Sequence, residues 1–520
     1  MKIIRTLGIG GLAATLLFGG AAVAGAALYS PEGRPLIETF DAAGSGQYDE
    51  LNGAAAEASF RHPGGVLVLK DGSVLVADTG NHRIRIVKDG QVSHFAGTEV
   101  SVLFDDAGLP VGALGDGTSD LSFFWSPVGL AADAKGNVYV ADKDNHAIRK
   151  IDAAGNVTTL AGNGVLGLED GKGEAAAFYA PSDVAVDAAG NVYVADTLNH
   201  AIRKIDPSGS VTTLNALSER TVEVFDGVID EAGDFKDGTL AQALFNEPAG
   251  LAIDPKGNLY VSDTGNQRIR YIDFAAGTVT TVAGGGTYAD EALYVEGFYV
   301  DGAAADARFY SPKGLALDKD GGLYIADSLN HSIRYLKDGK VVTVVGNANG
   351  EYGVVNGVDE KAQVDYPSDV AIDASGNLYV ADMYNNKIRK VEFYALPNGW
   401  TANGSIRVLY NNKAVTFDAQ PEIRSSRTMV PVRAIAEAMG YDVAFEGNDI
   451  VLTGASGTIK LTVGKLEVTQ TVGKTTKTVA IDAAPYVEGS RTYVPVRFFA
   501  EQIGVAVDWH AETTTVLLRD

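Results

Sequence analysis

The sequence predicts a mainly β fold, in which a six-bladed β-propeller closed by an N-terminal strand precedes a small C-terminal α+β domain. Two observations carry this prediction: a short motif recurs six times, and the same pattern of strands and turns frames every copy. One copy, at residues 195–203, reads Ala-Asp-Thr-Leu-Asn-His-Ala-Ile-Arg. Its aspartate recurs as Asp78, Asp142, Asp196, Asp263, Asp327 and Asp382. So long a period is typical of solenoids, arrays and propellers.

The frame around each motif indicates a propeller blade. In the third repeat an apolar run at 183–187 leads through a Gly/Asn turn into residues 192–194, which are β-branched or aromatic. After the motif come an apolar run at 201–205, a turn at 207–209 and a further run at 211–214. Such runs between turn residues predict four short strands per repeat. Four-stranded sheets repeated around an axis form a propeller, so six repeats predict six blades.

These six copies resemble the NHL repeat, which is named after an Asn-His-Leu signature. The resemblance covers roughly residues 60–394, with Ile in place of the signature Leu and with Gln267 and Asn386 where the other copies have His. It implies a six-bladed propeller. Some NHL propellers bind RNA, and related six-bladed propellers include metal-dependent lactonases and a peptide-amidating lyase with ligands in the central channel. Those ligands have no residue-by-residue match in this sequence.

The two ends of the repeat region complete each other. Residues 36–40 match the fourth strand of a repeat, and residues 52–60 match the connector that follows such a strand. The sixth repeat, in contrast, stops after its third strand near 391–393. The N-terminal strand should therefore complete the last blade, which removes the open sheet edges of a linear array.

Composition and the N-terminus indicate an exported protein. The 520 residues carry a formal net charge of −24, which disfavours nucleic acid as a partner. The absence of cysteine excludes disulfides and thiolate sites. Residues 1–27 read as a signal peptide: Lys2 and Arg5, an apolar core, then small residues for cleavage. An uncleaved anchor is the alternative; in both cases we expect an extracytoplasmic protein, secreted or associated with the cell envelope.

A second duplication defines the C-terminal region. Residues 427–437, Arg-Thr-Met-Val-Pro-Val-Arg-Ala-Ile-Ala-Glu, recur in similar form at 491–501. Pro431 and Pro495 suit a first helical turn, and apolar residues follow at helical spacing until Gly440 and Gly504. Each helix should lead into alternating strands, at 441–445 and 505–509. The domains are thus a signal peptide (1–27), a propeller (31–395), a linker (396–404) and an α+β domain (405–520).

Over about 110 residues this region resembles the copper amine oxidase N-terminal-like (stalk) domain. The resemblance rests on both copies of the Val-Pro-Val-Arg helix motif and implies an attachment or spacer role in an exported bacterial protein. His510 is its only histidine, which is too few for a copper site. Arg433 and Arg497 are expected to pair with Glu437 and Glu501 at i, i+4.

Long connectors between blades are the first candidate for a binding surface. The longest are residues 99–125, 217–245 and 286–309, and they are acidic and aromatic. Variable loops on a rigid scaffold commonly carry function, and this composition would suit a peptide, a glycan or Ca²⁺; solvated loops are the structural alternative. The candidate ligand-binding residues are Asp105, Asp106, Asp226, Asp230, Tyr288, Asp290, Tyr294 and Tyr299.

The channel is the second candidate. The first strand of each blade should line it, and the equivalent position is occupied by Gly65, Gly129, Asp183, Gly250, Gly314 and Asp369. Asp183 and Asp369 fall in opposite blades and are candidate ligands for a cation or a water at the channel mouth. The alternative is that both cap local backbone N–H groups.

Two recurrent positions are interpreted as structural. The motif histidines, at equivalent positions of separate blades, diverge around the ring and cannot converge on one metal ion, so we expect hydrogen bonds to neighbouring strands. An Asp-Gly or Asn-Gly pair in each connector should cap a short helical turn.

The sequence therefore favours an exported cell-envelope binding or scaffold protein, whose propeller binds a protein, peptide or glycan on its acidic, loop-rich face. No catalytic residue is assigned, and Ca²⁺ is the only cofactor that the composition suggests. Two alternatives stay open: a metal-dependent hydrolase or lyase with its site in the channel, and an extracytoplasmic ligand sensor that acts through a partner.

Overall fold

A computed structural model describes residues 28–30, 33–99, 104–225, 227–347, 349–455 and 457–520. The expected signal peptide, residues 1–27, lies outside this range. Among the helices of the described residues, none has the length and apolar character needed to cross a membrane.

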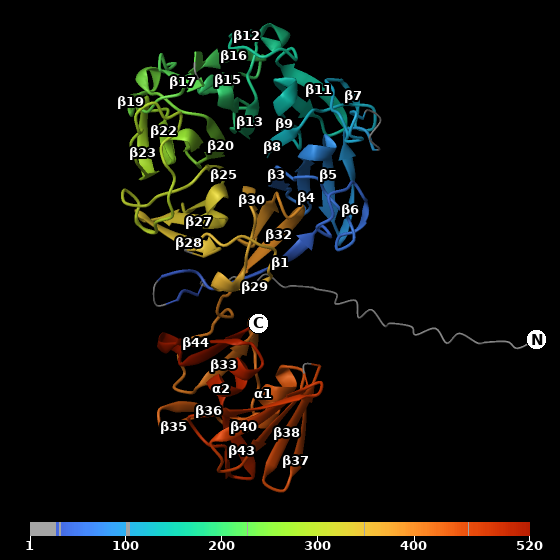
Figure 1. Cartoon of the computed structure of the whole chain (residues 1–520), viewed down its shortest axis with the longest axis vertical. Helices are drawn as coiled ribbons and strands as arrows, with labels where there is room; N and C mark the ends of the chain where they lie inside the picture. Colours follow the sequence, from blue (N-terminus) through green and yellow to red (C-terminus); the bar gives the residue numbers. More distant parts are fainter. Residues whose placement is uncertain (1–27, 31–32, 100–103, 226, 348, 456) are drawn as a thin grey trace, which may run out of the picture.

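The described residues before the C-terminal domain form six antiparallel sheets around a channel (Figure 1). Blade 1 contains β2 (Gly53–Ala54), β3 (Gly65–Val68), β4 (Val74–Asp78), β5 (Arg83–Lys88) and β6 (Gln91–Ala96). Blade 2 contains β7 (Gly117–Thr118), β8 (Pro127–Ala132), β9 (Val138–Asp142), β10 (Ala147–Ile151) and β11 (Asn156–Ala161). Blade 3 contains β12 (Gly171–Lys172), β13 (Pro181–Val186), β14 (Val192–Asp196), β15 (Ala201–Ile205) and β16 (Ser210–Thr213).

The other half of the ring repeats this order. Blade 4 contains β19 (Gly238–Thr239), β20 (Pro248–Ile253), β21 (Leu259–Asp263), β22 (Arg268–Asp273) and β23 (Thr278–Gly284). Blade 5 contains β24 (Gly302–Ala303), β25 (Pro312–Leu317), β26 (Leu323–Asp327), β27 (Ser332–Lys337) and β28 (Lys340–Val345). Blade 6 contains β29 (Gly357–Val358), β30 (Pro367–Ile372), β31 (Leu378–Asp382), β32 (Lys387–Phe393) and the N-terminal β1 (Ile37–Ala43). A separate hairpin, β17 (Thr221–Phe225) and β18 (Val228–Glu231), rises from the connector before blade 4.

Closure by the N-terminal strand is confirmed. β1 lies between β32 and β29 and pairs with both in antiparallel register, with Ile37 opposite Phe393 and Ala43 opposite Ile388. Ile37 is fully buried. The last blade is thus assembled from segments more than 300 residues apart, and the strand that the sixth repeat lacks comes from the start of the propeller.

The prediction of four strands per blade was incomplete. Each sheet has a fifth, outermost strand of two residues that begins at the glycine of the Asp-Gly or Asn-Gly pair and pairs with the fourth strand. The connector therefore runs along the outer edge of the blade before it crosses to the next one. A covered edge strand offers fewer free backbone groups for pairing with another chain.

Aromatic side chains fill the contacts between consecutive blades. Phe178 packs with Tyr139 and Ile148 of blade 2 and with Val184 and Val194 of blade 3. Equivalent, fully buried phenylalanines are Phe60, Phe124, Phe245 and Phe309. The core of the propeller is therefore a ring of apolar clusters that each span two blades, as expected when one repeat cannot bury its own hydrophobic face.

The C-terminal domain has its own core around two short helices, α1 (Val432–Ala438) and α2 (Val496–Gln502). Its first sheet contains β33 (Arg407–Tyr410), β34 (Lys413–Ala414), β44 (Ala506–His510) and β45 (Thr515–Arg519). Its second contains β35 (Glu422–Arg424), β36 (Arg427–Pro431), β42 (Tyr486–Glu488) and β43 (Arg491–Pro495). The third contains β37 (Asp442–Glu446), β38 (Asp449–Gly454), β39 (Gly457–Thr462), β40 (Glu467–Val472) and β41 (Thr475–Ala480). The predicted Arg433–Glu437 pair is present at 3.9 Å on the exposed surface, where such pairs contribute little.

This domain packs against the outer edge of blade 6 (Figure 1). A shared apolar cluster joins both parts: Leu28, Leu36, Val358, Tyr394, Leu409 and Leu517. Beside it, the Arg519 guanidinium donates to both carboxylate oxygens of Asp359, at 2.7 and 2.6 Å, and the same Asp359 accepts the N–H of Ile37 at 3.1 Å. One carboxylate therefore links the closing strand β1, the connector of blade 6 and the last strand of the C-terminal domain.

Candidate binding face and central channel

Each motif holds its own turn through a buried ion pair. In blade 3, Asp196 accepts the Tyr179 N–H at 2.7 Å, the Asn199 amide at 2.8 Å and the Arg203 guanidinium at 2.7 Å. Asp196 and Arg203 are both fully buried. All six blades repeat the Asp–Arg pair at 2.5 to 2.8 Å. A contact needed in every blade is a requirement of the fold, so the motif aspartates and arginines are structural.

The motif histidines connect consecutive blades. His200 Nδ1 accepts the N–H of Glu247, the residue before the first strand of blade 4, at 3.1 Å. His82, His146 and His331 do the same for Ser126, Ala180 and Tyr366, while Gln267 Oε1 and Asn386 Oδ1 accept from Ser311 and His62. Each of these residues has a positive φ, a conformation that Asn and His adopt more readily than most residues. The position thus requires an acceptor atom, which explains why Gln and Asn replace His.

The Asp-Gly and Asn-Gly pairs act differently from our expectation. We expected them to cap a helical turn, but Asp170 accepts the second guanidinium nitrogen of Arg203 at 2.9 Å and the N–H of Thr213 in the fourth strand at 3.1 Å. Asp237 and Asp301 make equivalent contacts in blades 4 and 5. These carboxylates hold the connector against the edge of the blade, which explains the fifth strand.

The two channel aspartates bridge blades. Asp183 accepts the N–H of Val184 and, across the blade boundary, that of Leu251 in blade 4, both at 2.8 Å. Asp369 accepts from Val370 at 2.8 Å and from Val66 of blade 1 at 2.9 Å. Every carboxylate oxygen therefore already accepts a backbone hydrogen bond. The described residues contain no group of three or more His, Asp or Glu side chains that could hold a metal ion.

Four of the six blades have a glycine at the channel position where blades 3 and 6 have Asp183 and Asp369. These glycines allow close contact between neighbouring channel strands within blades 1 to 3 and within blades 4 to 6. A Cβ atom on Gly129 would lie 2.5 Å from Cα of Asp183, and one on Gly314 would lie 2.5 Å from Cα of Asp369. The channel strands of blades 1 to 3 and of blades 4 to 6 thus approach too closely for a side chain. At the boundary between blades 3 and 4 the space is filled by Asp183, and at the boundary between blades 6 and 1 it is filled by Asp369. Because these two boundaries are opposite in the ring, the two aspartates face each other across the channel.

The shared channel raises the pKa of both carboxyl groups. Burial raises the pKa of Asp369 to about 7. For Asp183 the causes are burial and, second, the charge of Asp369. Because the folded protein then holds a proton that the unfolded chain releases near pH 4, stability should fall as the pH rises from about 4 to about 7.

We therefore expect Asp369→Asn to flatten this part of the pH profile. One proton corresponds to a slope of at most about 1.4 kcal/mol per pH unit, and the variant should lose that contribution while being less stable overall at acidic pH. Urea unfolding at half-unit intervals from pH 4 to pH 8 measures both profiles. Parallel profiles for the wild type and the variant would contradict a raised pKa for Asp369.

Exposed or half-buried apolar side chains from four of the six blades lie at the channel mouth on the face that carries the motif turns, here called the motif face. In blade 3 the N–H of Leu198, two residues after the motif aspartate, donates to the carbonyl oxygen of Tyr179, two residues before the proline of the first strand, at 3.1 Å. The same backbone hydrogen bond joins the equivalent two positions in each of the other blades. In blades 2, 3, 5 and 6 these two positions carry the large apolar or aromatic residues that we call the rim: Trp125, Tyr179, Leu198, Tyr310, Leu329 and Tyr384. The remaining positions carry Arg61, Gly80, Asp144, Asn246, Gly265 and Asp365. Tyr384 stacks on Tyr366, with ring centroids 4.7 Å apart.

Charged side chains lie just inside the rim. The residue after the first strand's proline is Gly64, Val128, Ser182, Ala249, Lys313 or Ser368, so blade 5 alone places a charge there. The Lys313 ammonium lies 5.9 Å from the centroid of the Tyr366 ring. Burial lowers the pKa of Lys313, and the Glu247 carboxylate opposes this. Glu247 in turn accepts the hydroxyl of Tyr294 at 2.7 Å.

The structure brings only some of the predicted loop residues together. Tyr288 and Tyr294 cover blade 4, where Tyr288 donates to Asn266, accepts from Asn246 and stacks under Arg220 at 4.0 Å. Arg220 also donates to the carbonyls of Ala292 and Leu293, so the long connectors at 217–245 and 286–309 pack on each other. Asp230 and Asp290 are exposed nearby.

The other predicted residues lie apart from this cluster. Asp105 accepts the N–H groups of Ala107 and Leu109 within its own turn, and Asp106 beside it is exposed. Tyr299 bonds Thr343 and stacks on Arg334 at the outer edge of blade 5. Asp226 lies outside the described residues. Aligning the repeats would have found Lys313 and the rim, because both stand out as side chains that change between otherwise equivalent blades.

Comparison with known families agrees with the repeat pattern. The NHL repeat matches at residues 60–87, 124–151, 178–205, 245–270, 309–334 and 365–391, one match in each blade. The propeller is built from six NHL repeats. The copper amine oxidase N-terminal domain matches residues 409–518, which confirms the second resemblance.

The curated relatives match over part of their length. The chain is 33% identical over 286 residues to protein SUPPRESSOR OF QUENCHING 1, chloroplastic, of Arabidopsis thaliana, covering 53% of this chain and 26% of the relative. It is 31% identical over 339 residues to NHL repeat-containing protein 2 of Homo sapiens, covering 61% and 44%. The chain thus spans less than half the length of either relative. A solved auxiliary nutrient binding protein from Bacteroides thetaiotaomicron is 15% identical with a TM-score of 0.48, covering 71% of this chain and 82% of that one.

Proposed function

We propose that the NHL propeller is an extracytoplasmic binding module of the cell envelope, and that it binds a protein or peptide through the rim. The observation that carries this proposal is the composition of the rim. Trp125, Tyr310 and Tyr384 are 41, 42 and 52% exposed, and Leu198 and Leu329 stand between them. Tyr and Trp are the residues that dominate the energetics of protein interfaces, and they lose little conformational entropy on binding.

Two further features support a peptide rather than a sugar alone. Leucines contribute apolar surface without a hydrogen-bonding group, which suits aliphatic and aromatic side chains of a partner. Inside the rim, Lys313 and Glu247 offer opposite charges that could fix the orientation of a chain with polar termini or charged side chains. The ordered backbone beneath, tied by the motif network in each blade, provides a rigid support for such contacts.

The proposal also assigns the location and the second domain. The basic residues, apolar run and small residues of the first 27 positions support export, and the C-terminal domain would serve as a spacer toward the envelope. Fractionation of cells together with determination of the mature N-terminus tests this part. Recovery of the chain with Met1 in the cytoplasmic fraction would refute it.

Replacing two rim aromatics should remove partner binding without unfolding the propeller. We expect the double variant Trp125→Ala, Tyr384→Ala to bind envelope proteins at least about tenfold more weakly in a quantitative pull-down, because interface aromatics of this kind contribute about 2 kcal/mol or more each. The matched control is Trp509→Ala, Phe445→Ala in the C-terminal domain, where the two side chains are 41 and 45% exposed.

Three outcomes are informative. Loss of binding in the rim variant alone supports the proposal. Equal loss in both variants, or no loss in either, places the partner elsewhere and contradicts it. If the wild type binds cell-wall polysaccharide alone, and the rim variant binds it more weakly, the rim is the binding site but its ligand is a glycan and not a peptide.

A further inference from the structure

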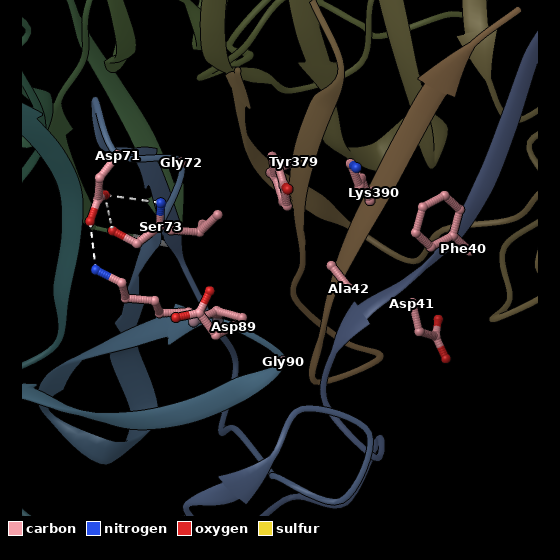
Figure 2. A pocket seen from close by; sticks show the side chains of 13 residues that line it. Phe40, Asp41, Ala42, Asp71, Gly72, Ser73, Asp89, Gly90, Tyr379 and Lys390 are labelled. Carbon is pink, nitrogen blue, oxygen red and sulfur yellow. Dashed lines mark hydrogen bonds and ion pairs between the residues drawn. The ribbon is translucent and has the colours of Figure 1, made fainter. Parts of the chain in front are cut away.

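A groove lies at the boundary between the last and the first blade, away from the rim. Its volume is about 300 Å³, and it is lined by Phe40, Ala42, Tyr379 and Lys390 of blade 6 and by Asp71, Lys88 and Asp89 of blade 1, among others (Figure 2). Asp71 and Asp89 lie in the turns between β3 and β4 and between β5 and β6, and Lys88 is the last residue of β5. Because consecutive hairpin turns alternate between the two ends of a blade, this groove opens on the face opposite the motif turns.

The same place is filled by an aromatic ring at two other boundaries. Tyr193 of blade 3, equivalent to Tyr379, is stacked by Phe274 of blade 4 with centroids 5.1 Å apart. Tyr324 of blade 5 is covered by Phe393 of blade 6 at 5.9 Å. Tyr193 and Tyr324 are consequently buried, whereas Tyr379 is only partly buried. At the boundary between blades 6 and 1, the position equivalent to Phe274 is Asp89.

Blade 6 also lacks the aromatic residue that two other blades place beside the tyrosine equivalent to Tyr379. In blades 4 and 5 the neighbouring strand supplies a tyrosine: Tyr324 stacks on Tyr335 with ring centroids 4.5 Å apart, and Tyr260 contacts Tyr271 in a tilted arrangement with centroids 4.8 Å apart. Blade 6 has Lys390 at this position, whose ammonium lies 5.8 Å from Tyr379 and 5.7 Å from Phe40. Lys390 is already paired with Glu392 at 2.6 Å. The rings of Tyr193, Tyr260 and Tyr324 each contact another aromatic ring, whereas the Tyr379 ring lines the groove and has the Lys390 ammonium over it.

The charges around the groove indicate which rings it favours. Its lining contains the carboxylates of Asp41, Asp71 and Asp89 and the ammonium groups of Lys88 and Lys390. Both lysines are neutralised, Lys88 by Asp71 at 2.7 Å. Asp89 lines the groove on the side opposite Tyr379 (Figure 2). Asp41 is paired with Lys387 and Arg389, and Asp71 with Lys88, which leaves Asp89 as the carboxylate that can receive a ligand cation. A ring that carries an amine can stack on Tyr379 and direct its ammonium toward Asp89, whereas the carboxylate of an acidic ring would be repelled by Asp89.

We propose that this groove is a binding site for a small aromatic amine, an arylalkylammonium ion, whose ring takes the place that Phe274 and Phe393 occupy elsewhere in the propeller. The volume is at the lower end of that of ligand pockets, which suits one ring with a short side chain. The site is independent of the rim and of the function proposed for it.

Four probes of similar size test the chemistry on the full chain: tyramine, tyrosol, 4-hydroxyphenylacetate and 2-cyclohexylethylamine. Ligand-observed NMR titration gives the dissociation constants. We expect tyramine to bind most tightly, about tenfold more tightly than 4-hydroxyphenylacetate and several-fold more tightly than 2-cyclohexylethylamine, because only tyramine combines the ring with the favourable charge. Equal binding of all four probes, or no binding of tyramine at millimolar concentration, would overturn the proposal.

Two variants that copy other blades, and a third that removes one charge, test the location of the site. Tyr379→Leu installs the residue that blade 1 has at this position, Leu75, and should weaken tyramine binding about tenfold. Lys390→Tyr copies blades 4 and 5 and should abolish binding by covering Tyr379. Asp89→Asn, which tolerates the positive φ of 49° at this turn, should remove the preference for tyramine over tyrosol.

The matched control is Lys150→Tyr, which makes the same change in blade 2. Tyr139 there is buried, so the control should bind tyramine like the wild type. If Lys390→Tyr and Lys150→Tyr behave alike, the ligand does not occupy this groove and the proposal fails.

Discussion

Replacing Arg203 with methionine is expected to lower the free energy of unfolding of the propeller by about 3 to 5 kcal/mol, the usual effect of removing one partner of a buried ion pair. Methionine keeps most of the apolar volume but leaves the fully buried Asp196 without its counterion. It also leaves the carbonyl oxygens of Ala177 and Glu169 without the guanidinium donors that now reach them at 3.0 and 2.9 Å.

The pH dependence of this loss distinguishes an electrostatic cause from a packing defect. Burial raises the pKa of Asp196 to about 6, and Arg203 opposes the rise. Without Arg203 the folded-state pKa should rise further, so the variant holds a proton over a wider range than the wild type does. Its stability should then continue to fall above pH 6, and the difference from the wild type should be larger at pH 8 than at pH 5.

Lys204→Met on the same strand is the control, because Lys204 is only partly buried and contacts the Tyr193 ring at 6.0 Å. It should change the stability by about 0.5 kcal/mol or less. Calorimetry gives the stability, and hydrogen exchange of β14 and β15 shows whether the loss begins in blade 3. A loss in Arg203→Met within about 1 kcal/mol of the control would contradict the structural role of the motif.

The repeat explains why so much of the fold could be predicted. Six copies of Asp, Asn and Arg at fixed spacing identify the strands on either side of each turn, and a missing fourth strand in the last copy identifies residue 37 and its neighbours as the closing strand. Both inferences use order along the chain and period, which a single sequence displays directly. The fifth strand could not be inferred this way, because two residues have no hydrophobic period and their position depends on the contact between Asp170 and Arg203.

The candidate sites were harder to predict, because they depend on differences between blades rather than on what the blades share. Asp183 and Asp369 were correctly placed in opposite blades, and their contacts with Leu251 and Val66 agree with the capping alternative. The composition of the acidic loops predicted a ligand-binding surface, but the Asp105 carboxylate accepts backbone N–H groups of its own turn. Lys313 lies one position before Gly314, so a comparison of the channel strands at the glycine position does not reveal it.

The contact between the C-terminal domain and the propeller could not be predicted from the sequence, because the segments that form it share no motif. These segments lie within residues 28–38, 358–360 and 508–520. Arg519 is 2% exposed and lies between Asp359 and Asp508, with its guanidinium 5.1 Å from the Tyr394 ring. Glu38 of the closing strand accepts the Tyr394 hydroxyl at 3.1 Å. These contacts make the C-terminal domain a support for the blade that closes the propeller.

Arg519→Ala should therefore destabilise the closure as well as the domain contact. We expect a loss of about 2 to 3 kcal/mol, less than for Arg203 because Asp359 and Asp508 are each 31% exposed and can be partly hydrated. In the wild type the two parts should unfold together in calorimetry. In the variant the transition should split in two, and hydrogen exchange should increase in β1 and β29 before it increases in other blades.

Two further variants separate the charge from the geometry of this contact. Arg519→Lys keeps the charge but cannot bind both oxygens of Asp359 in parallel, so it should recover only part of the stability. Arg433→Ala, which removes an exposed arginine paired at 3.9 Å, should have almost no effect. If β1 exchanges no faster in Arg519→Ala than in Arg433→Ala, the propeller closes without help from the C-terminal domain, and Asp359 must hold Ile37 independently of Arg519.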